Sequence, residues 1–277
     1  MQHKSYSPAT WSQHELHPKA KDESTLAFIF TMDLLNFSFW SELPEDERFA
    51  IEYRGRKWTG YWSLVAALQR ALEEGIPITT SDYWQNEDEC TLDALRHVFR
   101  SATDEEMPLL SERLVCLREA GQVLYENYDC SVATLVESAN GSAAGLVNTL
   151  GREFACFRDE HRYDGRKKPV RLMKRAQILV ADVWACFEGE GFGAFRDIDK
   201  LTMFADYRVP QILNSMGCLY YSPSLATAIN KKSFIETGSR WELQIRGEFR
   251  LPAQYQHEME AAGTETVLHH RTRSIWY

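Results

Sequence analysis

The spacing of apolar residues predicts α-helices along most of the chain beyond residue 60. The clearest segment is 61–74, where apolar side chains recur every three to four positions and Gly75 supplies the C-terminal stop. The apolar face of this segment carries Leu64, Ala67, Leu68 and Leu72. The same spacing predicts helices over residues 91–100, 108–128, 131–140, 143–158, 171–188, 207–216 and 222–231. We expect 171–188 to be a central helix because it is long and strongly apolar on one face.

Two segments before residue 60 follow other patterns. Residues 25–40 are dense in apolar and aromatic side chains and must be buried, but their spacing leaves both a strand and an irregular segment open. Residues 51–59 alternate around Arg54, Gly55 and Arg56, which is typical of a short hairpin. The predicted fold class is therefore mainly α, with a small β-hairpin element.

Length and composition favour one helical domain. The chain has 277 residues, of which 44% are hydrophobic and 26% are charged. It contains no internal repeat, low-complexity tract or Pro/Ser-rich linker. We expect a flexible N-terminus over residues 1–10 and a single domain over 11–277. The six cysteines are scattered without a C-x-x-C pair, which favours reduced, mostly buried thiols over a zinc site or a disulfide framework.

The charge balance limits the partners. Lys and Arg total 31 against 40 for Asp and Glu, a net charge of −9, so we expect no direct binding to nucleic acid. A single nucleotide stays open, because two or three local donors can hold one phosphate. The N-terminus lacks the apolar region of a secretory signal, and the apolar stretches are too short for a membrane span. We expect a soluble intracellular protein, located in the cytoplasm.

Residues 204–211 (FADYRVPQ) place a carboxylate, a phenol and a guanidinium side by side at the start of a predicted helix. Asp206 near a helix N-terminus is stabilised in its ionised form, which keeps its pKa low. Two interpretations stay open. Asp206 is a structural cap of that helix, or the cap also presents an ionised carboxylate to a pocket.

Other candidate groups are less specific. The glycine-rich segment 188–197 follows a predicted helix and not a strand, so we interpret it as a helix stop and not as a phosphate cradle. His14 and His97 could bind a metal or carry protons, but neither has a second ligand at i+4. Cations that could donate to a phosphate, or form a solvated helix face, are Lys174, Arg175, Lys200 and Arg208.

Several long and uncommon strings occur in order along the chain. They are LNFSFWSE (35–42), YRGRKWTGYWSLVAALQRALEEGIPIT (53–79), KRAQILVADVWACFEGEG (174–191), TMFADYRVPQIL (202–213), IRG (245–247) and HHRTRSIWY (269–277). Together they resemble the queuosine salvage family of queuosine 5'-phosphate N-glycosylases/hydrolases. The resemblance runs from about Trp11 to Gly247 and resumes at the C-terminus.

The resemblance implies a mostly α-helical fold like that of DNA glycosylases. It implies an enzyme that hydrolyses the N-glycosidic bond of queuosine 5'-phosphate and releases queuine for reuse in tRNA modification. The expected partners are therefore this nucleotide and queuine, with no cofactor, no metal and no membrane. We expect the chain to act as a monomer.

The resemblance also implies roles for the candidate residues. Cleavage gives the ribose oxocarbenium character, which a nearby carboxylate stabilises. Queuine is a 7-deaza base, so the usual protonation at N7 is unavailable and the pocket must supply hydrogen bonds and stacking. Asp206 would be the catalytic carboxylate. The substrate-binding residues would be Phe204 stacking on the base, His14 at the rim, Tyr207, and Arg208 or Lys174 at the phosphate.

One departure from the family pattern concerns the residues after Gly247. The resemblance implies a strand-like segment that ends at Gly247, followed by two helices, of which the second carries acidic residues of the active site. Here 30 residues (277 − 247) follow, and none is Asp. We expect a segment to be missing between Gly247 and about Gln256, which would lower the rate by several orders of magnitude and expose apolar surface.

Three hypotheses about function follow. The chain is an active glycosidase with Asp206 in its site, a catalytically impaired relative that binds queuine or its nucleotide without turnover, or a helical interaction scaffold. Release of queuine from queuosine 5'-phosphate distinguishes the first hypothesis from the other two. Thermal stabilisation by queuine distinguishes the second from the third, because a ligand that binds the native state raises its melting temperature.

Overall fold

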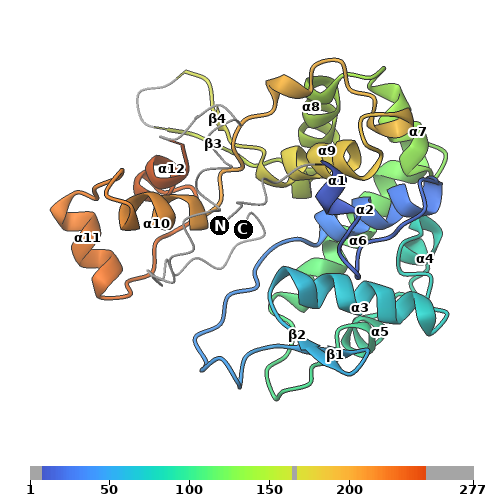
Figure 1. The fold of residues 1–277 in the computed structure, drawn as a ribbon, viewed down its shortest axis with the longest axis horizontal. Coiled ribbons are helices and arrows are strands. Elements are labelled where there is room, and N and C mark those ends of the chain that lie inside the picture. Colours follow the sequence, from blue (N-terminus) through green and yellow to red (C-terminus); the bar gives the residue numbers. More distant parts are fainter. Residues whose placement is uncertain (1–7, 164–166, 248–277) are drawn as a thin grey trace.

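The computed structural model describes residues 8–163 and 167–247, and this part of the chain is mainly helical, as predicted (Figure 1). The first helices are α1 (Pro8–Trp11), α2 (Glu23–Leu34), α3 (Tyr61–Glu73), α4 (Ser81–Gln85), α5 (Leu92–Val98), α6 (Leu110–Asn127), α7 (Val132–Ser138) and α8 (Ala143–Glu153). They are followed by α9 (Lys174–Cys186), α10 (Arg208–Ser215), α11 (Pro223–Asn230) and α12 (Arg240–Gly247). Short 3₁₀ turns are η1 (Ala155–Phe157), η2 (Gly191–Gly193) and η3 (Ile198–Lys200).

Two short antiparallel hairpins contain the four strands of the described residues. The first confirms the hairpin predicted over residues 51–59. Its turn residues, Arg54 and Gly55, have φ of 51° and 70°, the left-handed conformation that a two-residue hairpin turn requires. The second hairpin directly precedes α9. The paired strands are β1 (Ile51–Tyr53) with β2 (Arg56–Trp58), and β3 (Glu160–His161) with β4 (Val170–Arg171).

Helix α2 corrects the expectation for residues 25–40, which was a strand or an irregular segment. Its first turn is capped by Asp22, whose carboxylate accepts the backbone N–H of Thr25 at 2.9 Å. Nine of its twelve residues are buried. Because α2 is covered on nearly all sides, its apolar residues follow no 3.6-residue period, and the sequence pattern therefore did not identify a helix. Residues 35–40 are irregular.

Helix α2 lies at the centre of the large core and packs against α3, α6, α7 and α9. Its Phe30 is fully buried, with its ring 5.8 Å from that of Phe154 and 5.9 Å from that of Phe157. Burial of one such ring stabilises the fold by about 1.5–3 kcal/mol. Helix α9 is buried at most of its positions, which confirms the central helix predicted within residues 171–188.

The predicted helix boundaries are confirmed where local signals are strong. Helix α3 ends before Gly75, which has φ of 80°. One detail is wrong, because Leu72 is 38% exposed and Ala71 occupies the buried position instead. Side-chain caps begin α5, α7, α8 and α11, and each cap contributes about 1 kcal/mol. The capping residues are Thr91, Ser131, Ser142 and Ser222.

Helices α10 to α12 lie to one side of the larger region (Figure 1), and we call residues 205–247 the C-terminal lobe. Tyr220 and Phe234 of this lobe are 82% and 63% exposed. The lobe buries few apolar side chains, most of them in two small clusters. One contains Leu225, Ile229, Ile235 and Ile245, and the other joins Ala205 and Leu243 to Leu172 of the larger region.

The segment that ends at Gly247 is helix α12, so the expected strand-like conformation is wrong. Two adjacent pairs of residues, one turn apart on α12, are buried, as on one face of a helix. These are Glu242 and Leu243, then Ile245 and Arg246. Two of the four are charged, so the buried face of α12 does not follow an apolar pattern.

Some expectations concern residues outside the described part. These are residues 1–7 of the expected flexible N-terminus and the residues after Gly247, where a segment is expected to be missing. Residues 8–10 belong to α1, so that part of the expected flexible start is helical. All six cysteines are free, as predicted, and Cys218 is exposed. None of the helices in the described ranges combines the length and apolar character needed to span a bilayer.

Candidate functional site

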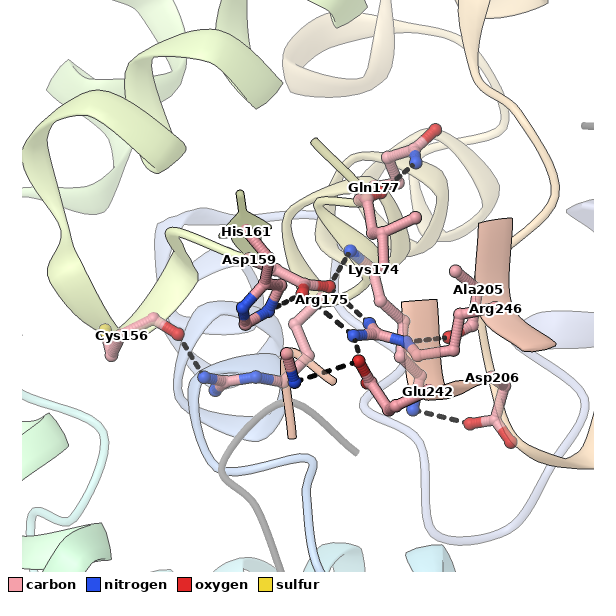
Figure 2. A network of polar contacts seen from close by, with 12 residues as sticks. Cys156, Asp159, His161, Lys174, Arg175, Gln177, Ala205, Asp206, Glu242 and Arg246 are labelled. Atoms are coloured by element: carbon pink, nitrogen blue, oxygen red, sulfur yellow. Dashed lines mark hydrogen bonds and ion pairs between the residues drawn. The ribbon is translucent and has the colours of Figure 1, made fainter. Parts of the chain in front are cut away.

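An ion pair between Asp206 and Lys174 is the centre of the candidate site (Figure 2). The ammonium nitrogen Nζ of Lys174, the first residue of α9, lies 2.5 Å from Oδ2 of Asp206. The Lys174 side chain is 6% exposed and that of Asp206 is 25% exposed. The structure therefore brings together two residues that the sequence analysis proposed separately, and leaves the carboxylate partly open to solvent.

The second carboxylate oxygen of Asp206 accepts a hydrogen bond at the start of α10. Oδ1 accepts the backbone N–H of Arg208, the first residue of α10, at 2.8 Å. Asp206 therefore satisfies an N–H of the first turn of α10 from the position before the N-cap, which is Tyr207 and makes no side-chain cap hydrogen bond. This contact leaves Oδ2 for Lys174.

The surroundings of Asp206 keep its carboxylate ionised. Burial by itself raises the pKa of Asp206, but the ammonium of Lys174, the N–H of Arg208 and the charge of Arg246 together bring the pKa below its usual value. Tyr207 shows the opposite effect, because burial and the Asp206 charge raise the pKa of its phenol. At neutral pH the site therefore holds a carboxylate beside a neutral phenol.

A second, deeply buried ion pair lies beside the first (Figure 2). Arg246 of α12 holds Asp159 with two nitrogens, at 3.0 Å to Oδ1 and 2.5 Å to Oδ2. Its Nη1 also lies 2.9 Å from Oε1 of Glu242, one turn earlier in α12. Its Nε donates to the carbonyl of Ala205 at 3.0 Å. Arg246 therefore contacts the larger region, its own helix and the residue before Asp206.

Asp159 links this second pair to α9. Its Oδ2 accepts the backbone N–H of Lys174 at 3.2 Å, and Nε2 of His161 lies 3.4 Å from its Oδ1. Burial raises the pKa of Asp159, but Arg246, His161 and the Lys174 N–H outweigh burial and hold the pKa at about 2. Asp159 is thus a permanent anion at neutral pH.

The sequence analysis missed Asp159, Glu242 and Arg246. Glu242 and Arg246 are four residues apart, the spacing of an ion pair on a helix. This spacing indicates an ion pair only in a helix, and a strand-like segment was expected there. Asp159 lies 87 residues before Arg246, and no local pattern relates two residues so far apart.

The other residues predicted from FADYRVPQ form one continuous turn with Asp206. Phe204 is half-buried, and its carbonyl accepts the N–H of Asp206 at 2.7 Å. Arg208 is exposed, with its guanidinium 5.5 Å from the ring centre of Tyr207. The turn thus offers a ring, a carboxylate, a phenol and a solvent-facing cation within five residues.

Two of the candidate phosphate donors have other contacts. The guanidinium of Arg175 is buried and donates to the carbonyls of Leu34 and Cys156, so the proposal that it holds a phosphate is wrong. Lys200 is 66% exposed and lies 3.8 Å from Asp199, as expected of a solvated face. Lys174 and Arg208 remain as candidate donors.

His14 belongs to an aromatic cluster. Its ring stacks on Trp62 with ring centres 3.4 Å apart, and its Nδ1 accepts the N–H of Leu16 at 3.2 Å. Within the described residues these contacts join His14 to the cluster and not to the turn that contains Asp206. His97 lies on the surface, 3.0 Å from Glu74.

A hollow of about 570 Å³ lies elsewhere, beside the end of α9. None of the predicted site residues lines it. We assign the site to the charged cluster, because buried ion pairs with shifted pKa values are concentrated at functional sites. Across residues 8–163 and 167–247, no three His, Cys, Asp or Glu side chains are grouped to hold a metal ion. The lining of the hollow includes Lys21, Glu137, Phe187, Phe192 and Phe195.

Residues 16–250 match the model of a family described as Queuosine salvage protein. The chain belongs to this family. A Schizosaccharomyces pombe relative named queuosine 5'-phosphate N-glycosylase/hydrolase is 46% identical over 245 residues, which cover 86% of this chain and 70% of the relative. Relatives of the same name are 47% identical over 242 residues in Nematostella vectensis (87% and 68%) and 38% identical over 291 residues in Sphaerobacter thermophilus (98% and 86%).

The queuosine salvage match confirms the resemblance inferred from the six strings. Its range contains both ion pairs of the candidate site, formed by Lys174 with Asp206 and by Asp159 with Arg246. His14 lies two residues before the matched range. The charged cluster is therefore part of the region that this chain shares with the queuosine salvage family.

Proposed function

We propose that this chain hydrolyses the N-glycosidic bond of queuosine 5'-phosphate. Its relatives of that name are 38–47% identical over most of the chain. In the reaction the bond between ribose C1' and the base nitrogen breaks, the oxygen of a water molecule bonds to C1', and a proton goes to the departing base. Queuine is thereby released for reuse in tRNA modification. The ion pair of Lys174 and Asp206 is the structural observation that supports this proposal.

Asp206 is the proposed catalytic carboxylate. Its negative charge is fixed before the reaction begins, so it stabilises positive charge that develops on the ribose without the cost of reorganisation. This stabilisation matters because the 7-deaza base cannot be protonated at N7. Lys174 keeps Asp206 ionised. The backbone N–H of Lys174 donates to Asp159, and the Asp206 carboxylate accepts the backbone N–H of Arg208, so both residues are held at helix starts.

The neighbouring residues bind the substrate in this proposal. Phe204 stacks on the base and Tyr207 donates its phenolic hydrogen. Arg208 holds the 5'-phosphate, because it is exposed while Lys174 is occupied by Asp206. The proposal also includes a fold like that of DNA glycosylases and a single domain from residue 11 onward.

The test is to incubate the purified chain with queuosine 5'-phosphate and to measure free queuine by HPLC. Queuosine without the phosphate is the matched substrate, and it is expected to react more slowly because it lacks the group that Arg208 binds. A folded protein that releases no queuine contradicts the proposal.

One observation favours the alternative of a family member that binds without turnover. Both oxygens of Asp206 are engaged, Oδ1 by the N–H of Arg208 and Oδ2 by Lys174. If turnover is absent and queuine nevertheless raises the melting temperature, the chain is such a binding protein.

A further inference from the structure

Two hydrogen bonds hold the backbone at the Lys174–Asp206 pair, and neither bond involves the charged groups of the pair. Arg246 donates through Nε to the carbonyl of Ala205, which is joined by its peptide bond to Asp206. Asp159 accepts the backbone N–H of Lys174. Arg246 and Asp159 therefore fix the backbone positions from which the side chains of Asp206 and Lys174 extend.

Arg246 and Asp159 are themselves joined by two hydrogen bonds, of 3.0 and 2.5 Å, and their side chains are 1% and 3% exposed. An ion pair that is shielded from water in this way is directional and is little screened by salt. Glu242 accepts a further hydrogen bond from Arg246 at 2.9 Å and a backbone N–H from Gly238 at 3.1 Å. Arg246 is thus bonded both to Asp159 of the larger region and to Glu242 of its own helix. We call these contacts between α12 and the larger region the joint.

We propose that Arg246 and Asp159 are positioning residues that set the distance between Lys174 and Asp206. They act by fixing the backbone of Ala205 and Lys174, and they do not touch the substrate. The activity readout for this role rests on the proposed function.

The first test is Arg246→Lys, which keeps the positive charge. A single ammonium group cannot serve both oxygens of Asp159, the Glu242 carboxylate and the Ala205 carbonyl in the geometry of a guanidinium. We expect kcat to fall about 10²-fold with a smaller change in KM, because the carboxylate is misplaced and the substrate is still bound.

The pH profile separates positioning from general support of the fold. The groups that face Asp206 are Lys174, Arg246, Tyr207 and the N–H of Arg208. When Lys174 moves away, burial acts on Asp206 with less opposition, so its pKa rises and the acid limb of kcat/KM moves toward neutral pH. The same movement is expected in Asp159→Asn, which preserves the shape of the side chain and serves as the second variant.

The matched control is Arg113→Lys. Arg113 is also fully buried, but it donates to the carbonyls of Leu35 and Phe37 in the large core. We expect this variant to lower the melting temperature while the acid limb stays where it is in the wild type.

A readout that is independent of activity is the reactivity of Lys174 toward acetic anhydride, measured by peptide mass spectrometry against Lys200. In the wild type Lys174 should be far less reactive than Lys200, because their side chains are 6% and 66% exposed. Arg246→Lys and Asp159→Asn should raise the Lys174 to Lys200 ratio several-fold, and Arg113→Lys should leave it unchanged.

Unchanged labelling of Lys174 in both folded variants overturns the positioning role, whatever the activity. If the wild type releases no queuine while the labelling changes as expected, the proposed function is wrong and the positioning role stands. Labelling that rises equally in Arg113→Lys would mean that Arg246 only stabilises the fold, and it also overturns the inference.

Discussion

The large core and the joint with the C-terminal lobe use buried arginines in different ways. In the core, the guanidinium carbons of Arg113 and Arg175 lie 4.3 and 4.9 Å from the ring centre of Phe37, and both groups donate to backbone carbonyls. At the joint, Arg246 binds Asp159 and Glu242. Carbonyls do not titrate, whereas carboxylates do. The geometry of the candidate site therefore depends on ionised acids, and the backbone around Phe37 does not.

The large core and the C-terminal lobe also differ in the apolar side chains that they bury. The large core contains fully buried rings such as Phe30 and Phe154, whereas a cluster of the lobe consists of four aliphatic residues. Hydrophobic stabilisation grows with the apolar area buried. The lobe therefore depends more on its few charged contacts, and these contacts also hold the candidate site.

The largest expected effect is on activity. Asp206→Ala removes the proposed catalytic carboxylate and should reduce queuine release by about 10³-fold, which corresponds to about 4 kcal/mol of transition-state stabilisation. Initial rates with queuosine 5'-phosphate measure this loss. Asp199→Ala is the matched control, since that carboxylate is 74% exposed, and it should keep wild-type rates. Wild-type turnover by Asp206→Ala would refute the assignment.

The next effect concerns the large core. Phe30→Ala leaves a cavity beside Phe154 and Phe157 and should lower the free energy of unfolding by at least about 3 kcal/mol. Ile229→Ala in the lobe should cost about 2 kcal/mol, and amide exchange should show that its effect is confined to α10–α12. Urea denaturation measures both. If both substitutions lower the free energy of unfolding equally and speed amide exchange throughout the protein, the distinction between core and lobe is wrong.

Acid should loosen the joint before it affects the large core. The pKa of Asp159 is lowered from 3.8 to about 2, which corresponds to about 2.5 kcal/mol of stability. Because the folded-state pKa is the lower one, this contribution is complete above about pH 4 and is lost as the pH falls through about 2. Amide exchange of α12 at pH 2–5 measures it. In Asp159→Asn this dependence should be absent, and an unaltered acid response there would contradict the attribution to Asp159.

The smallest effect is expected at an exposed ion pair. Arg96 and Asp93 are 2.6 Å apart, and their side chains are 48% and 88% exposed. Arg96→Gln should therefore change the free energy of unfolding by less than about 1 kcal/mol, measured by urea denaturation. A loss as large as that of Asp159→Asn would show that burial does not distinguish the two pairs.

Elements with local signals could be predicted from the sequence. Gly75 marked the end of α3, and Arg54 with Gly55 marked the β1–β2 turn. Helix α2 lacked such a signal because it is apolar on nearly every side, and α12 lacked one because half of its four buried side chains are charged. A pattern method requires a contrast between two faces, and neither helix offers it.

The sequence predicted individual residues of the candidate site but not how they contact one another. Asp206 and Lys174 could be chosen from the sequence because one precedes a helix and the other begins a string of the family. Their pairing, and the role of Asp159 and Arg246 behind it, follow from contacts between residues far apart in the chain. Charge complementarity over such separations has no local period, so only the folded structure shows it.

Helix α2 has a consequence for synthesis on the ribosome. Its end is tied to Arg175 of α9, and 141 residues separate Leu34 from that partner. At a translation rate of about 5–20 residues per second, roughly 7–28 s pass before α9 emerges. During this time α2, a segment rich in Phe, Ile, Leu and Met, lacks the part of its cover that α9 supplies. The nascent chain is therefore expected to bind a holding chaperone over α2 until α9 has been made.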